Sequence, residues 1–239
     1  MLGLNDVLGQ PKEVENLGKV YPVTLDKYED FMTHAQILQY TKKHFHADLQ
    51  EFTLFELAVS QLISAGALDS FKYMLFLVTD KEWHFYNAQN EQYMFISDDS
   101  VLNNKNFDEF RDVVMKQNLM YEDRVFKSPM LKRWADKVLD ARSKNGADVT
   151  LEDIVGVVHI FTGVPYHEIA QYTLYQLKYT FQRVIKLEAH RASVTLLPHR
   201  EDGKVEPFVD KVELYKHPYD DVFVEKSKLD GLNKAIGNK

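Results

Sequence analysis

The order of apolar and polar positions at the start of the chain predicts a short hairpin followed by a helix. Residues 12–24 form two extended pieces around Asn16-Leu17-Gly18-Lys19, where Asn and Gly tolerate the positive φ of a tight turn. After Thr24, a suitable N-cap, apolar residues recur at three- and four-residue steps, which predicts a helix from Asp26 to about His46.

A second helix and an aromatic β element are expected next. Thr53-Leu54-Phe55-Glu56 has the spacing of a capping box and predicts a helix that ends near Gly66. The aromatic clusters at residues 83–86 and 93–96 indicate a hairpin with a loop of about five residues. The apolar run at residues 71–76 fits a buried helix as well as a strand.

The rest of the chain carries helix signals. Start signals lie at Asn106, at Ser128-Pro129 and at Thr150, and Asn145-Gly146 supplies a stop. We expect the longest helix to begin with Pro165 in its first turn, where the missing amide hydrogen is harmless, and to run to about Arg191.

These elements predict an α+β fold that is predominantly α-helical. It has an N-terminal β-hairpin, a small aromatic β element and a helical C-terminal half. The 239 residues divide into an N-terminal α+β part, residues 1–127, and a helical C-terminal part, residues 128–239. A single domain is equally compatible with this length.

The expected long helix has two apolar stripes. One stripe steps by four and three residues through Ala170, Leu174, Leu177, Phe181 and Val184. The other consists of Tyr172, Tyr175 and Tyr179, which lie nearly opposite the first at 100° per residue. Two interpretations follow: the helix is central and covered on both sides, or the tyrosines form a surface that binds a partner or a second copy of the chain.

Composition narrows the classes of function. The formal net charge of -7 disfavours non-specific binding to a phosphate backbone, so nucleic acid is not the default partner. The chain has no cysteine, which removes disulfides and thiolate chemistry and suits a reducing compartment. The longest apolar run, Tyr73 to Val78, is far shorter than the roughly 20 residues of a membrane span, and the first ten residues lack the pattern of a secretory signal. We expect a soluble cytoplasmic protein.

The histidines and the standard enzyme motifs offer no strong catalytic or metal-binding candidate. His44 and His46 point apart on a helix, so they could chelate a metal only in an extended segment. His159 lies in an apolar stretch and is expected to be a hydrogen-bonded core residue. The sequence has no nucleophile elbow, phosphate-binding loop or dinucleotide turn. We therefore predict no catalytic, metal or cofactor-binding residues and a protein that is not an enzyme.

A basic stretch supplies an alternative. The helix expected at residues 130–144 carries Trp134 and five basic residues, which could contact nucleic acid: Lys132, Arg133, Lys137, Arg142 and Lys144. Asp136 and Asp140 dilute this charge and favour an ordinary solvated helix face.

Two stretches together resemble the tail assembly chaperones of long-tailed, siphovirus-like bacteriophages. The first is Pro11-Lys12-Glu13-Val14 with Gly18-Lys19-Val20-Tyr21-Pro22-Val23, which leads into a helix. The second is Thr162-Gly163-Val164-Pro165-Tyr166 with Glu168-Ile169 and Thr173-Leu174-Tyr175-Gln176-Leu177. They cover about a sixth of the chain, and neither is a strict signature.

The resemblance implies a non-enzymatic role in virion morphogenesis. Such chaperones coat the aggregation-prone tape measure protein, recruit tail tube subunits in the host cytoplasm and are absent from the mature virion. The family supplies no catalytic residue and no positional motif for client binding. Our hypothesis from sequence is therefore a tail assembly chaperone, with a regulatory protein that binds nucleic acid or a host protein as the alternative. An enzyme with an unrecognised site is a third possibility.

Overall fold

The computed structural model describes residues 3–49, 51–88, 92–126, 128–145, 149–199 and 204–222. Internal contacts group the chain into two units, each made of two stretches of sequence. The first unit comprises Met1–Asp123 and Leu151–Leu214, and the second comprises Arg124–Thr150 and Tyr215–Lys239. The division into an N-terminal α+β part, residues 1–127, and a helical C-terminal part, residues 128–239, stays a prediction.

The expected N-terminal hairpin is present. β1 (Lys12–Val14) pairs antiparallel with β2 (Gly18–Val20), and Asn16 and Gly18 adopt the positive φ values that the turn requires, 59° and 88°. A one-turn helix, α1 (Leu4–Val7), precedes it and was not expected from sequence.

The helix expected from Asp26 to His46 is wrong in its extent. A short 3-10 turn (Leu25–Lys27) leads into α2 (Tyr28–His34), and further 3-10 turns follow at Gln36–Gln39, Lys42–His44 and Ala47–Leu49. The apolar residues that predicted the helix nevertheless lie in the core, since Phe31, Ala35 and Leu38 are fully buried. The α-helix ends at His34, and further along the carbonyls of Leu38 and Tyr40 accept hydrogen bonds from the Arg111 guanidinium instead of from amides one helical turn ahead.

Two helices follow, and the first confirms the capping box. The Thr53 hydroxyl accepts from the Glu56 amide at 3.2 Å and the Glu56 carboxylate accepts from the Thr53 amide at 2.7 Å, opening α3 (Leu54–Ser64). Gly66 then turns the chain with a φ of 65°. The ambiguous run at residues 71–76 lies within α4 (Leu68–Thr79) and is therefore helical.

The aromatic β element is a three-stranded antiparallel sheet in the order β3-β4-β5. β3 (His84–Ala88) and β4 (Gln92–Ser97) confirm the hairpin, and β5 (Ser100–Leu102) is an addition. Residues 87 and 88 continue the strand where a loop was expected, and residues 89–91 lie outside the described residues. Phe95 is fully buried, and its ring contacts Phe55, Phe71 and Phe85.

α5 (Phe107–Gln117) begins after Asn106 as expected. The Asn106 amide group donates to the carbonyls of Glu15 and Val101, so this side chain ties the N-terminal hairpin to β5 instead of capping its own helix. The main hydrophobic core lies between this helix, α3, α4, the hairpin and the sheet.

The second unit contains α6 (Pro129–Asn145), which begins at the expected Ser128-Pro129 signal. Ala135 is fully buried, and Asp136 accepts a 2.6 Å hydrogen bond from Tyr219, which belongs to a short 3-10 turn (Pro218–Asp221). Arg124 forms an ion pair with Asp220 of the same turn. The basic helix is thus held to the C-terminal part of its own unit.

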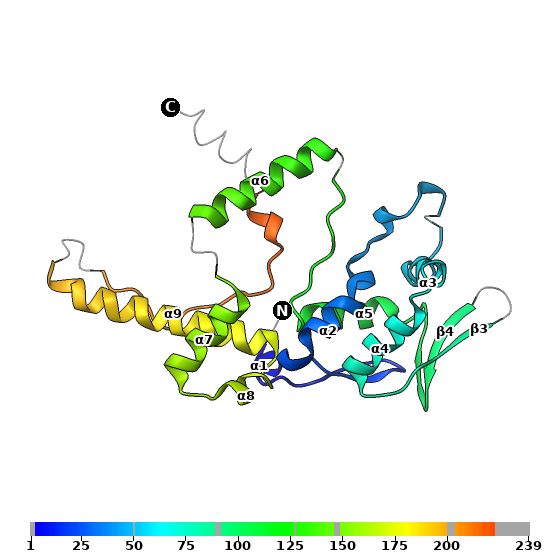
Figure 1. Cartoon of the computed structure of the whole chain (residues 1–239), viewed down its shortest axis with the longest axis horizontal. Helices are drawn as coiled ribbons and strands as arrows, with labels where there is room; N and C mark the ends of the chain where they lie inside the picture. Colours follow the sequence, from blue (N-terminus) through cyan, green and yellow to red (C-terminus); the bar gives the residue numbers. More distant parts are fainter. Residues whose placement is uncertain are drawn as a thin grey trace. The chain divides into compact units, whose positions relative to one another are not determined.

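α7 (Leu151–Thr162) confirms the Thr150 signal, but the long helix expected to start at Pro165 is wrong there. Pro165 instead precedes a single turn, α8 (Tyr166–Ile169), and the long helix α9 (Leu174–Leu196) starts only after Thr173. Thr173 and Gln176 form a second capping box, with bonds of 3.1 and 2.9 Å, that fixes this later start. α7 packs on the first half of α9, and a small core forms there from Ile154, Val158, Ile169 and Leu177 (Figure 1).

The fold class is confirmed: the protein is predominantly α-helical with two small antiparallel sheets. Within the described part of the chain, no helix combines the length and the hydropathy needed to span a membrane.

One stretch, residues 21–26, joins the two cores, and we call it the crossing segment: it has no helix up to Thr24 and then enters the 3-10 turn at Leu25. Four of its backbone amides donate hydrogen bonds to acceptors elsewhere in the first unit. The bonds run from Tyr21 to the Val78 carbonyl at 2.7 Å, from Val23 to the Asn118 side chain at 2.9 Å, from Leu25 to the Tyr172 carbonyl at 2.9 Å and from Asp26 to the Ala170 carbonyl at 3.0 Å. Thr24 also forms an antiparallel bridge with Thr173, which explains why no helix passes through residues 170–173.

The Asn118 contact can be tested by mutation. Asn118 is 1% exposed, and an Asn118→Ala change leaves the buried Val23 amide hydrogen without an acceptor. We expect the free energy of unfolding to fall by about 1–3 kcal/mol, measured by urea unfolding with far-UV circular dichroism. The exposed Asn104→Ala variant is the control and should change stability by less than about 0.5 kcal/mol. Equal stability of the two variants would contradict this role for Asn118.

Candidate functional site

The three tyrosines expected on one stripe occupy different environments. Tyr172 lies in the turn before α9 and is half-buried, and its carbonyl accepts from Leu25 of the crossing segment. Tyr175 is only 5% exposed, whereas Tyr179 is half-buried. The structure therefore brings Tyr175 and Tyr179 together and leaves Tyr172 outside the helix. Their role in binding a partner stays a prediction.

Tyr175 and Tyr179 begin a stack that Arg183 completes. The two rings are parallel within 15°, with centroids 6.0 Å apart, and the Arg183 guanidinium lies 4.9 Å above the Tyr179 ring. Arg183 also donates a 2.9 Å hydrogen bond to the Tyr179 hydroxyl. Burial raises the pKa of Tyr175, the charges of Asp6 and Tyr179 act in the same direction, and Arg183 opposes them. Tyr175 is thus a neutral packing residue that supports the stack.

A basic line continues along the same side of α9 and was missed by the sequence analysis. Arg183, Lys186, His190 and Ser193 are spaced by three, four and three residues, which places them on one face of a helix. The three- and four-residue spacing indicates a shared helix face, but no cluster of like charges marks these residues in the sequence.

Residues 204–214 run along this basic line without forming a helix or strand, and we call them the return segment. Arg183 donates to the Asp210 carbonyl at 2.9 Å, and Lys186 pairs with the Asp210 carboxylate at 2.6 Å. Further along α9, His190 Nδ1 lies 2.6 Å from the Glu206 carbonyl, and Ser193 accepts from the Glu206 amide at 3.0 Å. The chain therefore covers this face of α9 with its own return segment, in which Asp210 supplies a carboxylate.

A cleft of about 550 Å³ lies beside the crossing segment within the first unit. Its lining includes Tyr21, Pro22 and Val23 from the first stretch that carries the chaperone resemblance, and Thr173 and Gln176 from the second. Apolar side chains at its margin are partly exposed: Leu8 by 54%, Tyr21 by 41% and Phe76 by 39%. Two stretches about 150 residues apart thus share one concave surface.

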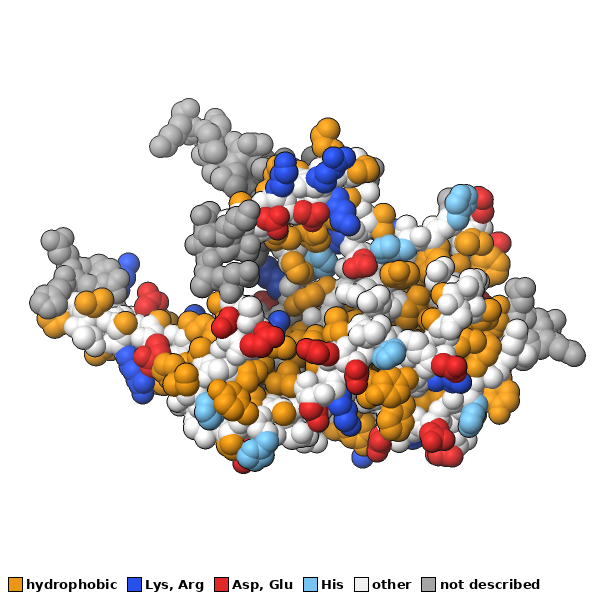
Figure 2. All heavy atoms as spheres, in the orientation of Figure 1, with side chains coloured by type: hydrophobic (Ala, Val, Ile, Leu, Met, Phe, Trp, Pro, Cys, Tyr) orange, Lys and Arg blue, Asp and Glu red, His pale blue; other side chains and the backbone are white. Residues whose placement is uncertain are grey.

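Hydrophobic side chains also reach the surface over α7 and along the second half of α9 (Figure 2). Ile160 and Phe161 at the end of α7 are 75% and 51% exposed, and Leu196 at the end of α9 is 53% exposed. Exposed apolar groups of this density are a common feature of surfaces that bind other proteins.

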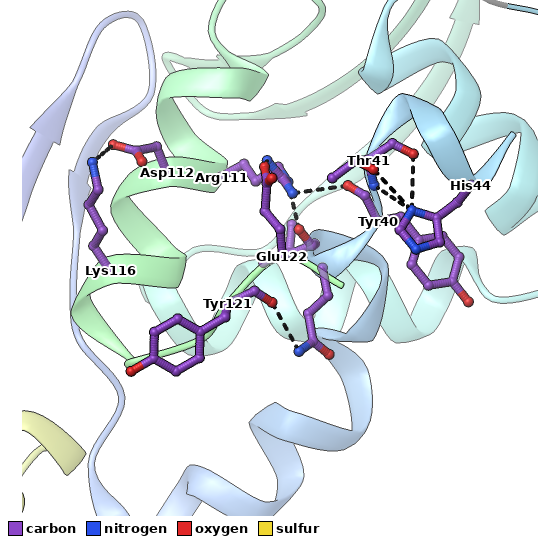
Figure 3. Close-up of polar contacts among 10 residues, drawn as sticks. Tyr40, Thr41, His44, Arg111, Asp112, Lys116, Tyr121 and Glu122 are labelled. Carbon is purple, nitrogen blue, oxygen red and sulfur yellow. Dashed lines mark hydrogen bonds and ion pairs between the residues drawn. The ribbon is translucent and has the colours of Figure 1, made fainter. Parts of the chain in front are cut away.

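Arg111 is a buried cation that the sequence analysis did not select. It is 8% exposed, and its guanidinium donates to the carbonyls of Leu38 and Tyr40 at 2.6 and 2.9 Å and to Glu122 at 2.7 Å. Figure 3 shows this guanidinium between the Tyr40 backbone and the Glu122 carboxylate. All three groups come from the chain itself, so Arg111 holds the turns after α2 against α5 and has a structural role.

The histidines behave as ordinary side chains. His44 is exposed and accepts from the Thr41 amide at 3.0 Å, while the exposed His46 pairs with Asp48. His159 is half-buried, and its Nδ1 lies 2.8 Å from the Val164 carbonyl, so the predicted hydrogen bond is confirmed. Among the residues that the structure describes, no three His, Asp or Glu side chains are grouped to hold a metal.

The basic side chains of α6 are interleaved with acidic ones. Lys132, Arg133 and Lys137 are exposed, and Asp136 and Asp140 fall between them around the helix at 100° per residue. Side chains beyond residue 141 of this helix, including Arg142 and Lys144, lie outside the described residues. The described part of α6 is therefore a mixed-charge face.

Comparison with known proteins relates the chain to a protein of prophage origin. Residues 142–208, which include α7, α8 and α9, match the family described as the YomV second domain. Over 209 residues the chain is 22% identical to the SPbeta prophage-derived uncharacterized protein YomV of Bacillus subtilis (strain 168), covering 87% of this chain and 88% of that protein. No solved structure is significantly similar. These similarities do not bear on tail assembly, so that part of the resemblance stays a prediction.

The buried position of Tyr175 leads to a stability test. Replacing Tyr175 with Ala empties a site that is 5% exposed, so we expect the free energy of unfolding to fall by about 3–5 kcal/mol. Tyr175→Phe keeps the ring and should cost less than about 1 kcal/mol. Chemical denaturation of both variants checks this, and equal stabilities would argue that Tyr175 is a surface residue.

Proposed function

We propose that this protein is a bacteriophage tail assembly chaperone, which binds the tape measure protein and recruits tail tube subunits without catalysing a reaction. The observation that carries the proposal is the meeting of the two stretches that resemble such chaperones. They line the same cleft, and residues 24–26, directly after the first stretch, bond to residues 170–173 at the second. The similarity to a prophage-derived protein supports a phage setting for this activity.

The surface chemistry suits a protein that holds a client. A helical, aggregation-prone client presents apolar stripes that must be covered until assembly. The cleft offers Tyr21, Phe76 and Leu8 as partly exposed apolar contacts beside polar side chains such as Lys27 and Gln171. A cleft lined by both apolar and polar side chains can bind such stripes reversibly, because its polar groups are solvated again when the client leaves.

The alternative function, a regulatory protein that binds nucleic acid or a host protein, receives less support from the described surface. Asp136 and Asp140 lie between the exposed basic residues of α6 and would repel a phosphate backbone. The net charge of -7 acts in the same direction. This alternative stays a prediction.

An affinity pull-down from host cells late in phage production, read by mass spectrometry, tests the proposal. We expect the tagged protein to recover a long tape measure protein or a tail tube protein that is absent from an uninfected culture. A Tyr21→Ser variant removes an aromatic group from the cleft and should recover at least about fivefold less client, equivalent to about 1 kcal/mol. Tyr86→Ser is the matched control, because Tyr86 is 51% exposed on β3 and is not part of the cleft lining.

The outcomes separate the candidate functions. Recovery of nucleic acid or host enzymes without any tail protein would overturn the chaperone proposal. Equal loss of client in Tyr21→Ser and Tyr86→Ser would mean that the protein binds its client at a surface other than the cleft.

A further inference from the structure

The return segment contacts both ends of the basic line of α9. Arg183 and Ser193 are ten residues apart, which is about 15 Å along a helix. Residues 206–210 could span at most about 13 Å, and the chain bends at residues 208–209. Asp210 contacts Arg183 and Lys186 while Glu206 contacts His190 and Ser193, so the segment runs antiparallel to the helix. Five residues with a central bend therefore contact the line at both ends.

The helix side of this contact is organised independently of the return segment. Arg183 is fixed by its hydrogen bond to the Tyr179 hydroxyl and by its position above the Tyr179 ring. Tyr179 in turn stacks on the buried Tyr175. A cation held in this way loses little conformational freedom when a ligand arrives, which favours binding.

The return segment itself is weakly held. Val209 is 68% exposed, and Phe208 is 52% exposed although its ring contacts His190 with centroids 5.2 Å apart. The side chains of Lys186 and Asp210 are 37% and 33% exposed, and a pair of this kind changes an equilibrium by about fivefold or less. One oxygen of Asp210, Oδ1, is buried without a hydrogen-bond partner among the described residues. The segment is therefore a replaceable occupant of a prepared surface.

We propose that the face of α9 formed by Arg183, Lys186, His190 and Ser193 is a binding site for a short, non-helical segment of a partner protein that carries a carboxylate, and that the return segment occupies this site in its absence. The partner supplies a carboxylate to Lys186, a backbone carbonyl to Arg183 and a further peptide group to His190 and Ser193. The proposal rests on the proposed function only in assuming that the protein binds other proteins.

Competition with a synthetic peptide tests the exchange. The probe is a fluorescein-labelled peptide with the sequence of residues 204–214, and fluorescence anisotropy reports its binding to the full-length protein. In the wild-type chain the tethered copy competes at an effective concentration in the millimolar range, so the free peptide should bind weakly. Asp210→Lys in the protein weakens the tethered copy, and we expect the free peptide to bind more tightly, by up to about fivefold.

Matched substitutions on α9 assign the effect to the basic line. In the Asp210→Lys background, Lys186→Ala should weaken peptide binding about fivefold. Arg191→Ala removes one positive charge from the same helix, but Arg191 pairs only with Glu188 in the described contacts and faces away from the line, so binding should be unchanged. A peptide carrying Lys in place of Asp210 should bind poorly to every variant.

Either of two results would overturn the inference, with circular dichroism confirming that each variant is folded. One is equal peptide binding by the wild-type and Asp210→Lys proteins. The other is equal loss in Lys186→Ala and Arg191→Ala, which would indicate attraction by general charge. If the peptide test fails but the pull-down recovers tail proteins, the chaperone function uses another surface. If the peptide binds but no tail protein is recovered, the site on α9 is retained and the chaperone function is rejected.

Discussion

The constraint on which the first unit depends is the pairing of the crossing segment's backbone amides. An extended chain that passes between two cores must satisfy each buried N–H group, because an unpaired one costs about as much as a lost hydrogen bond. Here the acceptors come from the end of α4, from Asn118 after α5 and from the turn before α9. Val23 joins the main core and Leu25 packs against the smaller one, so residues 21–26 link two cores that are distant in sequence.

The features that could be predicted from sequence depend on neighbours within a few residues. The Thr53 capping box and the Asn16–Gly18 turn are of this kind, and both are present as expected. The helix boundaries that were wrong depend on distant groups. The Arg111 guanidinium donates hydrogen bonds to the carbonyls of Leu38 and Tyr40, and the Leu25 amide donates one to the carbonyl of Tyr172. Only the Thr173–Gln176 capping box was a local signal that could have corrected the start of α9.

The candidate site shows the same limit. Helical spacing identified Tyr175 and Tyr179 as neighbours, and their rings stack. Spacing could not show that Tyr172 falls outside the helix, or that Arg183 and Lys186 contact Asp210, more than 20 residues further along the chain. Charges that lie far apart in sequence look like a solvated surface until the fold brings them together.

An internal occupant of the basic line has a consequence for selectivity. A tethered segment lowers the apparent affinity of every competing ligand by the same factor, the fraction of molecules in which the site is open. Ligands that interact through charge alone bind weakly, so they do not displace the tethered segment. A partner that supplies both a carboxylate and correctly spaced backbone groups can bind tightly enough to displace it. On a protein of net charge -7, covering the basic face of α9 thus restricts its use to segments that combine a carboxylate with backbone groups matching the whole line.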